Sequence, residues 1–191
     1  EAGSTPSSYI PTTSATVTRA AETLTVPAAN LPYSSTNMSI QMDGKMTGDN
    51  LVFTRWFKDA DNSILQKSGA ANFVFAQEAS NVIDASTGGS FTSGVNVEFN
   101  LASRHGATFV QGAEGGSSLT ADTTPTALPD LSVSDLTLGR TFMGTIGQFR
   151  MWDEDLTDAG IVTATLPSTE PSLSLTFDGS ETSFTVLDWS E

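Results

Sequence analysis

The stretch "LTLGRTFMGTIGQFRMWDEDLTDAGI", residues 136–161, carries the signals that decide the fold. Within it, "GTIGQFRMW" at 144–152 has the apolar and aromatic content of a β-strand that follows a glycine turn. An acidic run at 153–155 comes next. "LTDAGIVTATL", residues 156–166, is the one segment with a helical pattern, and its glycine should limit it to a turn or two. The stretch therefore predicts a strand, a turn and a short helix.

The rest of the chain also consists of short apolar runs that are separated by turns. In "NMSIQM", Met38, Ile40 and Met42 should share one face of a strand. In "LVFTRWF", alternation places Phe53 on one side and Trp56 on the other. Further strands are expected in "NFVFAQ" (72–77), "VNVEFNL" (95–101), "ATFVQG" (107–112), "SDLTLG" (134–139), "LSLTF" (173–177) and "SFTVLDW" (183–189). Many short strands at this spacing indicate an antiparallel sandwich or barrel.

The composition narrows the classes of partner. Eight basic residues against 22 acidic ones give a formal net charge of −14, which excludes a nucleic-acid backbone and disfavours anionic membranes as partners. The chain has no cysteine, so it has neither a disulfide framework nor thiolate chemistry. No apolar run approaches the length of a transmembrane helix, so we expect no membrane insertion. A start without methionine suggests a fragment or a processed product.

Three segments together resemble the concanavalin A-like, laminin-G-like jelly roll. They are 51–69 ("LVFTRWFKDADNSILQKSG"), 95–116 ("VNVEFNLASRHGATFVQGAEGG") and 136–161. The last is similar to that family's run of a Gly-ended strand, "G-x-I", an "R-x-W" strand and a leucine that opens a short helix. The central hairpin departs from the family pattern, since the place of the usual "x-N-G"-like turn reads Gln111-Gly112 and then Gly115-Gly116. The resemblance implies an all-β, antiparallel two-sheet jelly-roll sandwich with one short helix.

The N-terminal segment 1–26, "EAGSTPSSYIPTTSATVTRAAETLTV", resembles a junction found in bacteriophage tail-fibre and other virion proteins. It implies an extended linker at 1–22, from an upstream domain, and a jelly-roll domain at 23–191. The jelly-roll family contains sugar binders, glycosidases, interaction modules and structural domains. The fold therefore does not assign a function by itself.

Trp152 and the acidic run behind it form the first candidate site. Asp153 and Asp155 could share a face about 7 Å apart, near the spacing of glycosidase carboxylates. They could also bind Ca²⁺. However, they follow the strand and adjoin a helix start, where Asp155 or Thr157 could cap the first N–H groups. We therefore interpret the cluster mainly as a strand end and a helix cap, with no catalytic residue.

Four other residues are candidates for glycan binding, together with Trp152. Trp56 occupies a position where the family packs a tryptophan into the core, although stacking on a sugar is an alternative. Tyr33 lies in a turn-rich segment and could offer its ring to a pyranose or, equally, cap the edge of the sheet. Arg104 and His105 are expected at an exposed hairpin tip, where they could hydrogen-bond an acidic polysaccharide.

These patterns predict a non-catalytic glycan-binding domain of a bacteriophage virion protein, a tail or head fibre that attaches to host surface polysaccharide. No cofactor is required by the sequence, although Ca²⁺ remains an option. A trimer or another repeated assembly at the virion surface is expected, in contact with other virion proteins. The first alternative is a purely structural virion module, such as a capsid decoration. The second is a polysaccharide hydrolase or lyase.

Overall fold

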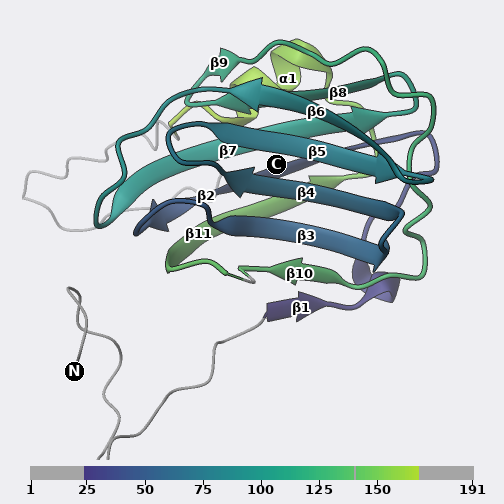
Figure 1. Cartoon of the computed structure of the whole chain (residues 1–191), viewed down its shortest axis with the longest axis horizontal. Coiled ribbons are helices and arrows are strands. Elements are labelled where there is room, and N and C mark those ends of the chain that lie inside the picture. Colours follow the sequence, from purple (N-terminus) through teal and green to yellow (C-terminus); the bar gives the residue numbers. More distant parts are fainter. Residues whose placement is uncertain (1–23, 140, 168–191) are drawn as a thin grey trace, which may run out of the picture.

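The computed structural model of the chain describes residues 24–139 and 141–167, which form two antiparallel sheets stacked face to face (Figure 1). The six-stranded sheet consists, in spatial order, of β1 (Leu24–Val26), β10 (Leu136–Leu138), β3 (Val52–Asp59), β4 (Asn62–Ser68), β5 (Phe73–Ala79) and β6 (Val82–Gly88). The five-stranded sheet consists of β11 (Gly144–Trp152), β2 (Asn37–Met46), β7 (Val97–Gly106), β8 (Phe109–Glu114) and β9 (Ser117–Ser118). A 3₁₀ turn, η1 (Ala28–Asn30), and one helix, α1 (Thr157–Ala164), complete this part of the chain. The two-sheet jelly-roll sandwich with a short helix is thus confirmed.

The core lies between the sheets and follows the predicted alternation in β2. Met38, Ile40 and Met42 are fully buried. From the other sheet, Phe53 and Phe73 pack with Met42, and Trp56 and Ile64 pack with Met38 and Ile40. Such a face-to-face arrangement of alternating side chains is the usual core of a β-sandwich. None of the described helices is long and apolar enough to cross a bilayer. The predicted linker at 1–22 and the predicted strands at 173–177 and 183–189 lie outside the described residues.

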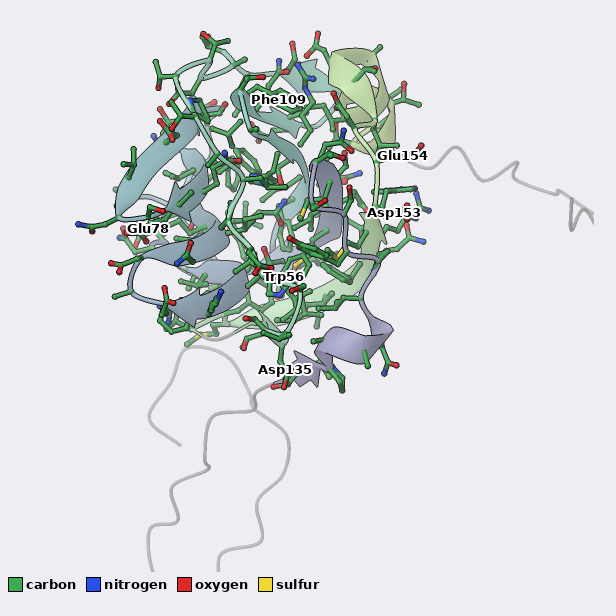
Figure 2. All side chains as sticks on the ribbon, turned by 90° about the vertical axis from the view of Figure 1, so that its right-hand side faces the viewer. Trp56, Glu78, Phe109, Asp135, Asp153 and Glu154 are labelled. Carbon is green, nitrogen blue, oxygen red and sulfur yellow. The ribbon has the colours of Figure 1, made fainter. Side chains whose placement is uncertain are left out.

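One predicted strand differs from simple alternation. The pairing of β3 with β4 shifts register between Val52 and Thr54, so that Phe53 and Trp56 both point into the core. A β-bulge of this kind re-aims the side chains that follow it. The prediction that these two rings lie on opposite sides was therefore wrong. Figure 2 shows Trp56 between the two sheets.

A chain of buried polar groups joins the two sheets through the core. Thr54 Oγ1 donates to Gln66 Oε1 at 3.2 Å, and Gln66 Nε2 donates to Ser103 Oγ of the opposite sheet at 2.7 Å. All three residues are at most 1% exposed. Buried polar groups lose their interaction with water, so each needs a partner of this kind in the interior.

His105 continues this chain. Its Nε2 lies 2.9 Å from Ser103 Oγ and its Nδ1 lies 3.3 Å from Gln77 Oε1. Because Gln77 Nε2 donates to the carbonyl of Gly106, Gln77 Oε1 is the acceptor and His105 carries its proton on Nδ1. The Ser103 hydroxyl then donates to Nε2. Burial alone lowers the pKa of His105 to about 3, so the ring is neutral in this network.

Helix α1 packs on β7 and β8 at the outer face of the five-stranded sheet; Figure 1 shows it beside β8 and β9. The helix can approach because the strands beneath it present Ala102 and Ala113, on which Ile161 packs fully buried. The Asn100 side chain donates to the carbonyl of Leu166 at 3.3 Å and so anchors the end of the helical segment. Among the described residues α1 is the only α-helix, so the rest of this outer face carries none from that part of the chain.

Candidate functional site

The outer face of the five-stranded sheet carries polar residues in rows across its strands. The register places Arg150 beside Gln41, Gln148 beside Asp43, and Asp43 beside Asn100. These five residues come from β11, β2 and β7, and α1 packs beside them, on Ala102 of β7 and Ala113 of β8. Because side chains alternate along a strand, the same strands that supply the core also supply this polar face.

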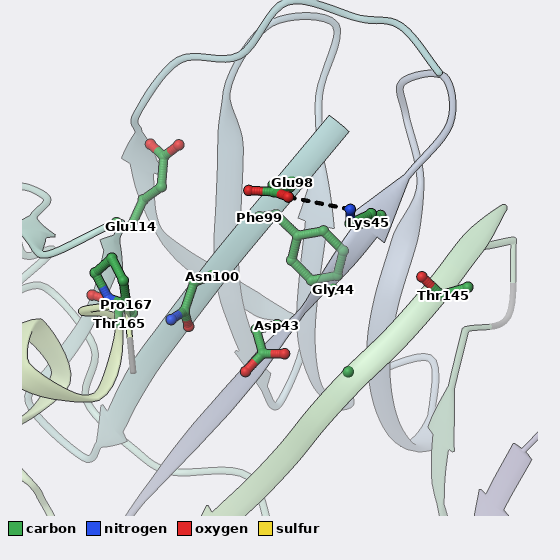
Figure 3. A pocket seen from close by; sticks show the side chains of 12 residues that line it. Asp43, Gly44, Lys45, Glu98, Phe99, Asn100, Glu114, Thr145, Thr165 and Pro167 are labelled. Atoms are coloured by element: carbon green, nitrogen blue, oxygen red, sulfur yellow. Dashed lines mark ion pairs between the residues drawn. The ribbon is translucent and has the colours of Figure 1, made fainter. Parts of the chain in front are cut away.

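Two adjoining hollows of about 510 and 520 Å³ lie over these rows and share Asp43, Asn100 and Pro167. We call them together the polar groove. One part is bordered by Gln41, Gln148, Arg150 and the residues at the end of α1; the other is bordered by Lys45, Glu98, Glu114 and Thr145. Figure 3 shows Asp43 and Asn100 on neighbouring strands, with Thr165 and Pro167 beside them.

Gln41 forms the buried floor of the first part of the groove. It is 1% exposed, and its Nε2 donates to Asn100 Oδ1 at 2.9 Å and to Asp43 Oδ2 at 3.2 Å. These two acceptors fix which end of the amide is the NH₂ group. Gln41 Oε1 is the only buried side-chain polar atom among the described residues that has no hydrogen-bond partner. A buried acceptor in this state is one that a ligand hydroxyl or N–H could satisfy.

Asp43 is held rigidly at the centre of the groove. Its Oδ1 accepts the backbone N–H of Gln148 at 3.0 Å, where β11 bulges away from β2. Gly147 leaves room for this carboxylate, since a Cβ at that position would overlap Asp43 Oδ1. Both carboxylate oxygens are thus oriented by the protein while each keeps a lone pair for a further donor.

Charge is balanced unevenly along the groove. Lys45 and Glu98 form an exposed ion pair at 3.2 Å, drawn as the dashed line in Figure 3. Burial raises the pKa of Glu114, although its hydrogen bond from the Ser90 N–H opposes the shift. With Asp43 and Arg150, the lining contains three carboxylates against two cations. The charged side chains that line the groove therefore carry a small excess of negative charge.

The candidate cluster at Trp152 lies on the same outer face, beside the covered part. Trp152 is partly buried opposite Ser39, whose hydroxyl donates to the carbonyl of Glu154 and accepts the N–H of Leu156. Asp153 is exposed next to α1 (Figure 2). The hydroxyl of Ser39 thereby fastens the turn that leads into the helix.

Arg104 also serves this turn. Its guanidinium binds Asp155 at 3.0 Å and Gln111 at 2.7 Å and lies over the Phe109 ring, 4.4 Å from the centroid. Asp155 Oδ1 accepts the N–H of Thr157 at 2.8 Å. The interpretation of the acidic run as a strand end and helix start is consistent with these contacts. Because of these contacts, the Arg104 side chain, which is 18% exposed, is bound to other residues of the protein.

The structure gives a metal no prepared site among these residues. The described residues contain no group of three or more His, Cys, Asp or Glu side chains that could hold an ion. The carboxylate of Asp155, one of the two predicted Ca²⁺ ligands, is paired with Arg104. A cation there would have to displace the guanidinium.

Two of the predicted glycan contacts are core residues instead. Trp56 is fully buried and its Nε1 donates to the carbonyl of Ser134 at 2.6 Å, so it cannot stack on a sugar. His105 is also fully buried, because β7 continues to Gly106 and turns its side chain inward. The prediction that His105 lies exposed at a hairpin tip was wrong.

Tyr33 is the remaining predicted contact, and it is not among the residues that line the groove. Its ring packs edge-on against Trp56, with centroids 5.8 Å apart, and its hydroxyl donates to Asp130 at 3.4 Å. Burial and the negative charge of Asp130 raise the pKa of Tyr33. Its partly buried ring covers one edge of the core.

The sequence did not single out the groove residues Gln41, Asp43, Asn100, Gln148 and Arg150. A signal was present, since polar residues alternate with Met38, Ile40 and Met42 in the strand at 37–46. That alternation marks an outward face but does not tell whether another element covers it.

Neither protein-family models nor curated proteins match the sequence. Solved structures do share the fold. A heptameric SAP-like pentraxin from Limulus polyphemus matches with a TM-score of 0.53 and 9% sequence identity. The matched region covers 71% of this chain and 71% of the pentraxin chain. The CBM40 of Ruminococcus gnavus IT-sialidase, bound to α2,3-sialyllactose, has a TM-score of 0.56 at 13% identity and covers 69% of this chain and 84% of that chain. The binding domain of botulinum neurotoxin serotype D matches with a TM-score of 0.57 and 11% sequence identity. The matched region covers 77% of this chain and 40% of the neurotoxin chain. At these identities the likeness establishes the jelly-roll fold.

Proposed function

We propose that this chain is a non-catalytic glycan-binding module and that the polar groove is its binding site. The observation that carries the proposal is the buried, unpartnered Oε1 of Gln41 at the floor of a groove lined by amides, a carboxylate and a guanidinium. Sugars present many hydroxyls that donate and accept hydrogen bonds, and sites of this composition recognise them through a few well-placed polar groups.

The comparisons support the class of ligand. One neighbour of similar fold is a carbohydrate-binding module with sialyllactose bound, and another is a toxin binding domain. The proposal for this chain rests on its own groove, since these structures share with it only the fold.

A more specific role follows from the N-terminal resemblance. We propose that the module belongs to a bacteriophage tail or head fibre and contributes to attachment to host surface polysaccharide. The phage-like junction at 1–26 supports this role. Binding would take place at the virion surface, outside the host cell. Several copies per particle would raise the effective concentration of weak individual sites.

A structural role in the virion is the second candidate, favoured by a different surface. Val82 and Ile83 on the edge strand β6 are 53% and 67% exposed, and Phe57 on the same sheet is 39% exposed. Phe57 and Ile83 lie in one row across the sheet, with Ser63 and Glu78 between them. Exposed apolar side chains on an edge strand favour contact with another protein. This surface lies on the sheet opposite the polar groove.

The experiment that tests the proposed function is titration of the chain with a panel of bacterial surface polysaccharides, with and without Ca²⁺, while product formation is followed. R150A should weaken binding because Arg150 lines the groove. K67A is the matched control, since Lys67 is a cation on the six-stranded sheet.

Saturable binding that R150A weakens and K67A does not would support the proposal. Release of shortened products would replace it with a hydrolase or lyase. If the folded chain binds no glycan but associates with itself or with virion proteins, the structural role is the better account.

A further inference from the structure

The polar groove also carries information about the kind of glycan. We propose, building on the function proposed above, that the ligand is a neutral oligosaccharide whose hydroxyls donate to Gln41 and Asp43. The inference deepens the proposed function by naming the ligand class of the same site.

The floor of the groove offers several hydrogen-bond acceptors. Gln41 Oε1 is buried and lacks a partner, and the two oxygens of Asp43 each accept only one hydrogen bond from the described residues. Three acceptor positions thus lie on adjacent residues of one face of β2, and each can take a hydroxyl proton. A ligand must bring donors to satisfy them, and adjacent ring hydroxyls provide such donors.

The charges in and around the groove favour a neutral ligand over an anionic one. An anionic sugar over the middle of the groove would lie against Asp43, which carries no ion pair with any described residue. Lys45 is already paired with Glu98. The whole chain carries a formal charge of −14, so its field repels polyanions before they reach the site. Arg150 can still donate hydrogen bonds at the edge of the groove, but its single positive charge is small beside the net negative charge of the chain.

The sequence-based idea of an acidic polysaccharide loses its basis for the same reason. It relied on Arg104 and His105 as exposed basic groups. Arg104 is paired with Asp155, and His105 is buried and neutral. Neither can offer a free positive charge to a carboxylated sugar.

The length of the groove along β2 favours an oligosaccharide over a single sugar. Gln41 in one part of the groove and Lys45 in the other are four residues apart on β2, which corresponds to about 13 Å along the strand. Asp43 and Asn100 lie between them and belong to both parts. A run of this length is longer than one pyranose ring, so the site fits at least two linked sugars.

The test uses the folded chain and calorimetric titration with oligogalacturonides, from monosaccharide to hexasaccharide, in the free-acid and the fully methyl-esterified forms. The two forms differ in charge but not in linkage. A parallel series of neutral gluco-, galacto- and manno-oligosaccharides widens the search. D43N removes the charged acceptor, and E78Q makes the same change on the outer side of the six-stranded sheet, where Figure 2 shows Glu78.

The expected result is binding of neutral members that strengthens from monosaccharide to disaccharide and is little affected by salt. D43N should weaken it about tenfold or more, the effect of losing one hydrogen bond to a charged group, whereas E78Q should leave it unchanged. Equal losses in D43N and E78Q would overturn the inference. So would binding restricted to the anionic forms that salt and R150A abolish, although the glycan-binding function would then stand. No binding by any member of the panel would instead remove the proposed function itself.

Discussion

His105 should make the fold sensitive to acid in a range where few other groups titrate. The ring is fully buried, and its pKa is lowered from 6.5 to about 3. Between these two values the unfolded chain binds a proton that the folded protein does not bind. The free energy of unfolding therefore falls as the pH falls from about 6.5 towards 3.

The magnitude follows from the size of the shift. Each pH unit below 6.5 costs about 1.4 kcal/mol, so the loss at pH 5 is about 2 kcal/mol relative to pH 7. The structural reason is specific. A proton on Nε2 would face the hydroxyl hydrogen of Ser103, which must then turn away and weaken the link from one sheet to the other.

The assay is urea unfolding of the wild type and of H105Q at several pH values between 7 and 5. Glutamine does not titrate there, so the difference between the two proteins isolates His105. The pKa of Glu114 is raised, so this residue increases the free energy of unfolding as the pH falls. Both proteins contain Glu114, so its effect cancels in the difference between them. The wild type should lose about 2 kcal/mol more than H105Q between pH 7 and pH 5.

An independent measurement avoids mutagenesis. The chain contains one histidine, so its imidazole proton signals can be assigned in an NMR titration without further work. In the folded protein they should not move between pH 7 and pH 5. A titration midpoint near 6.5, or equal pH slopes for wild type and H105Q, would refute the reasoning.

Two further predictions concern the core. W56F removes the donor to the carbonyl of Ser134 and should lower the free energy of unfolding by about 2 kcal/mol in urea denaturation, and an unchanged midpoint would contradict the assigned hydrogen bond. G112A should cost about 2 kcal/mol or more because a Cβ there would overlap the Phe75 ring. G94A, where space is available, is its control, and similar thermal stability of the two glycine variants would argue against this packing.

Much of the fold could be predicted from local patterns. The alternation of Met38, Ile40 and Met42 identified the buried face of β2, and the pattern at 156–166 identified the helix. The bulge in β3 escaped prediction because it depends on pairing with β4, and no residue in the strand announces it. His105 escaped for a related reason, since the end of β7 is set by its hydrogen bonds to β8.

The candidate site was predicted less well. Aromatic and charged residues such as Trp152 and Arg104 attract attention in a sequence, yet the structure uses Arg104 to hold the turn before α1. The groove depends on which part of a polar face stays uncovered. That is a property of how α1 packs, and short-range patterns do not contain it.

The two alanines under α1 have a consequence for how such a module can diversify. Ala102 and Ala113 let the helix settle on one half of the sheet, and so they set where the open half begins. Larger side chains at these positions would lift or shift the helix and change the width of the recess beside it. The shape of the groove could therefore be changed through two methyl groups that do not line it.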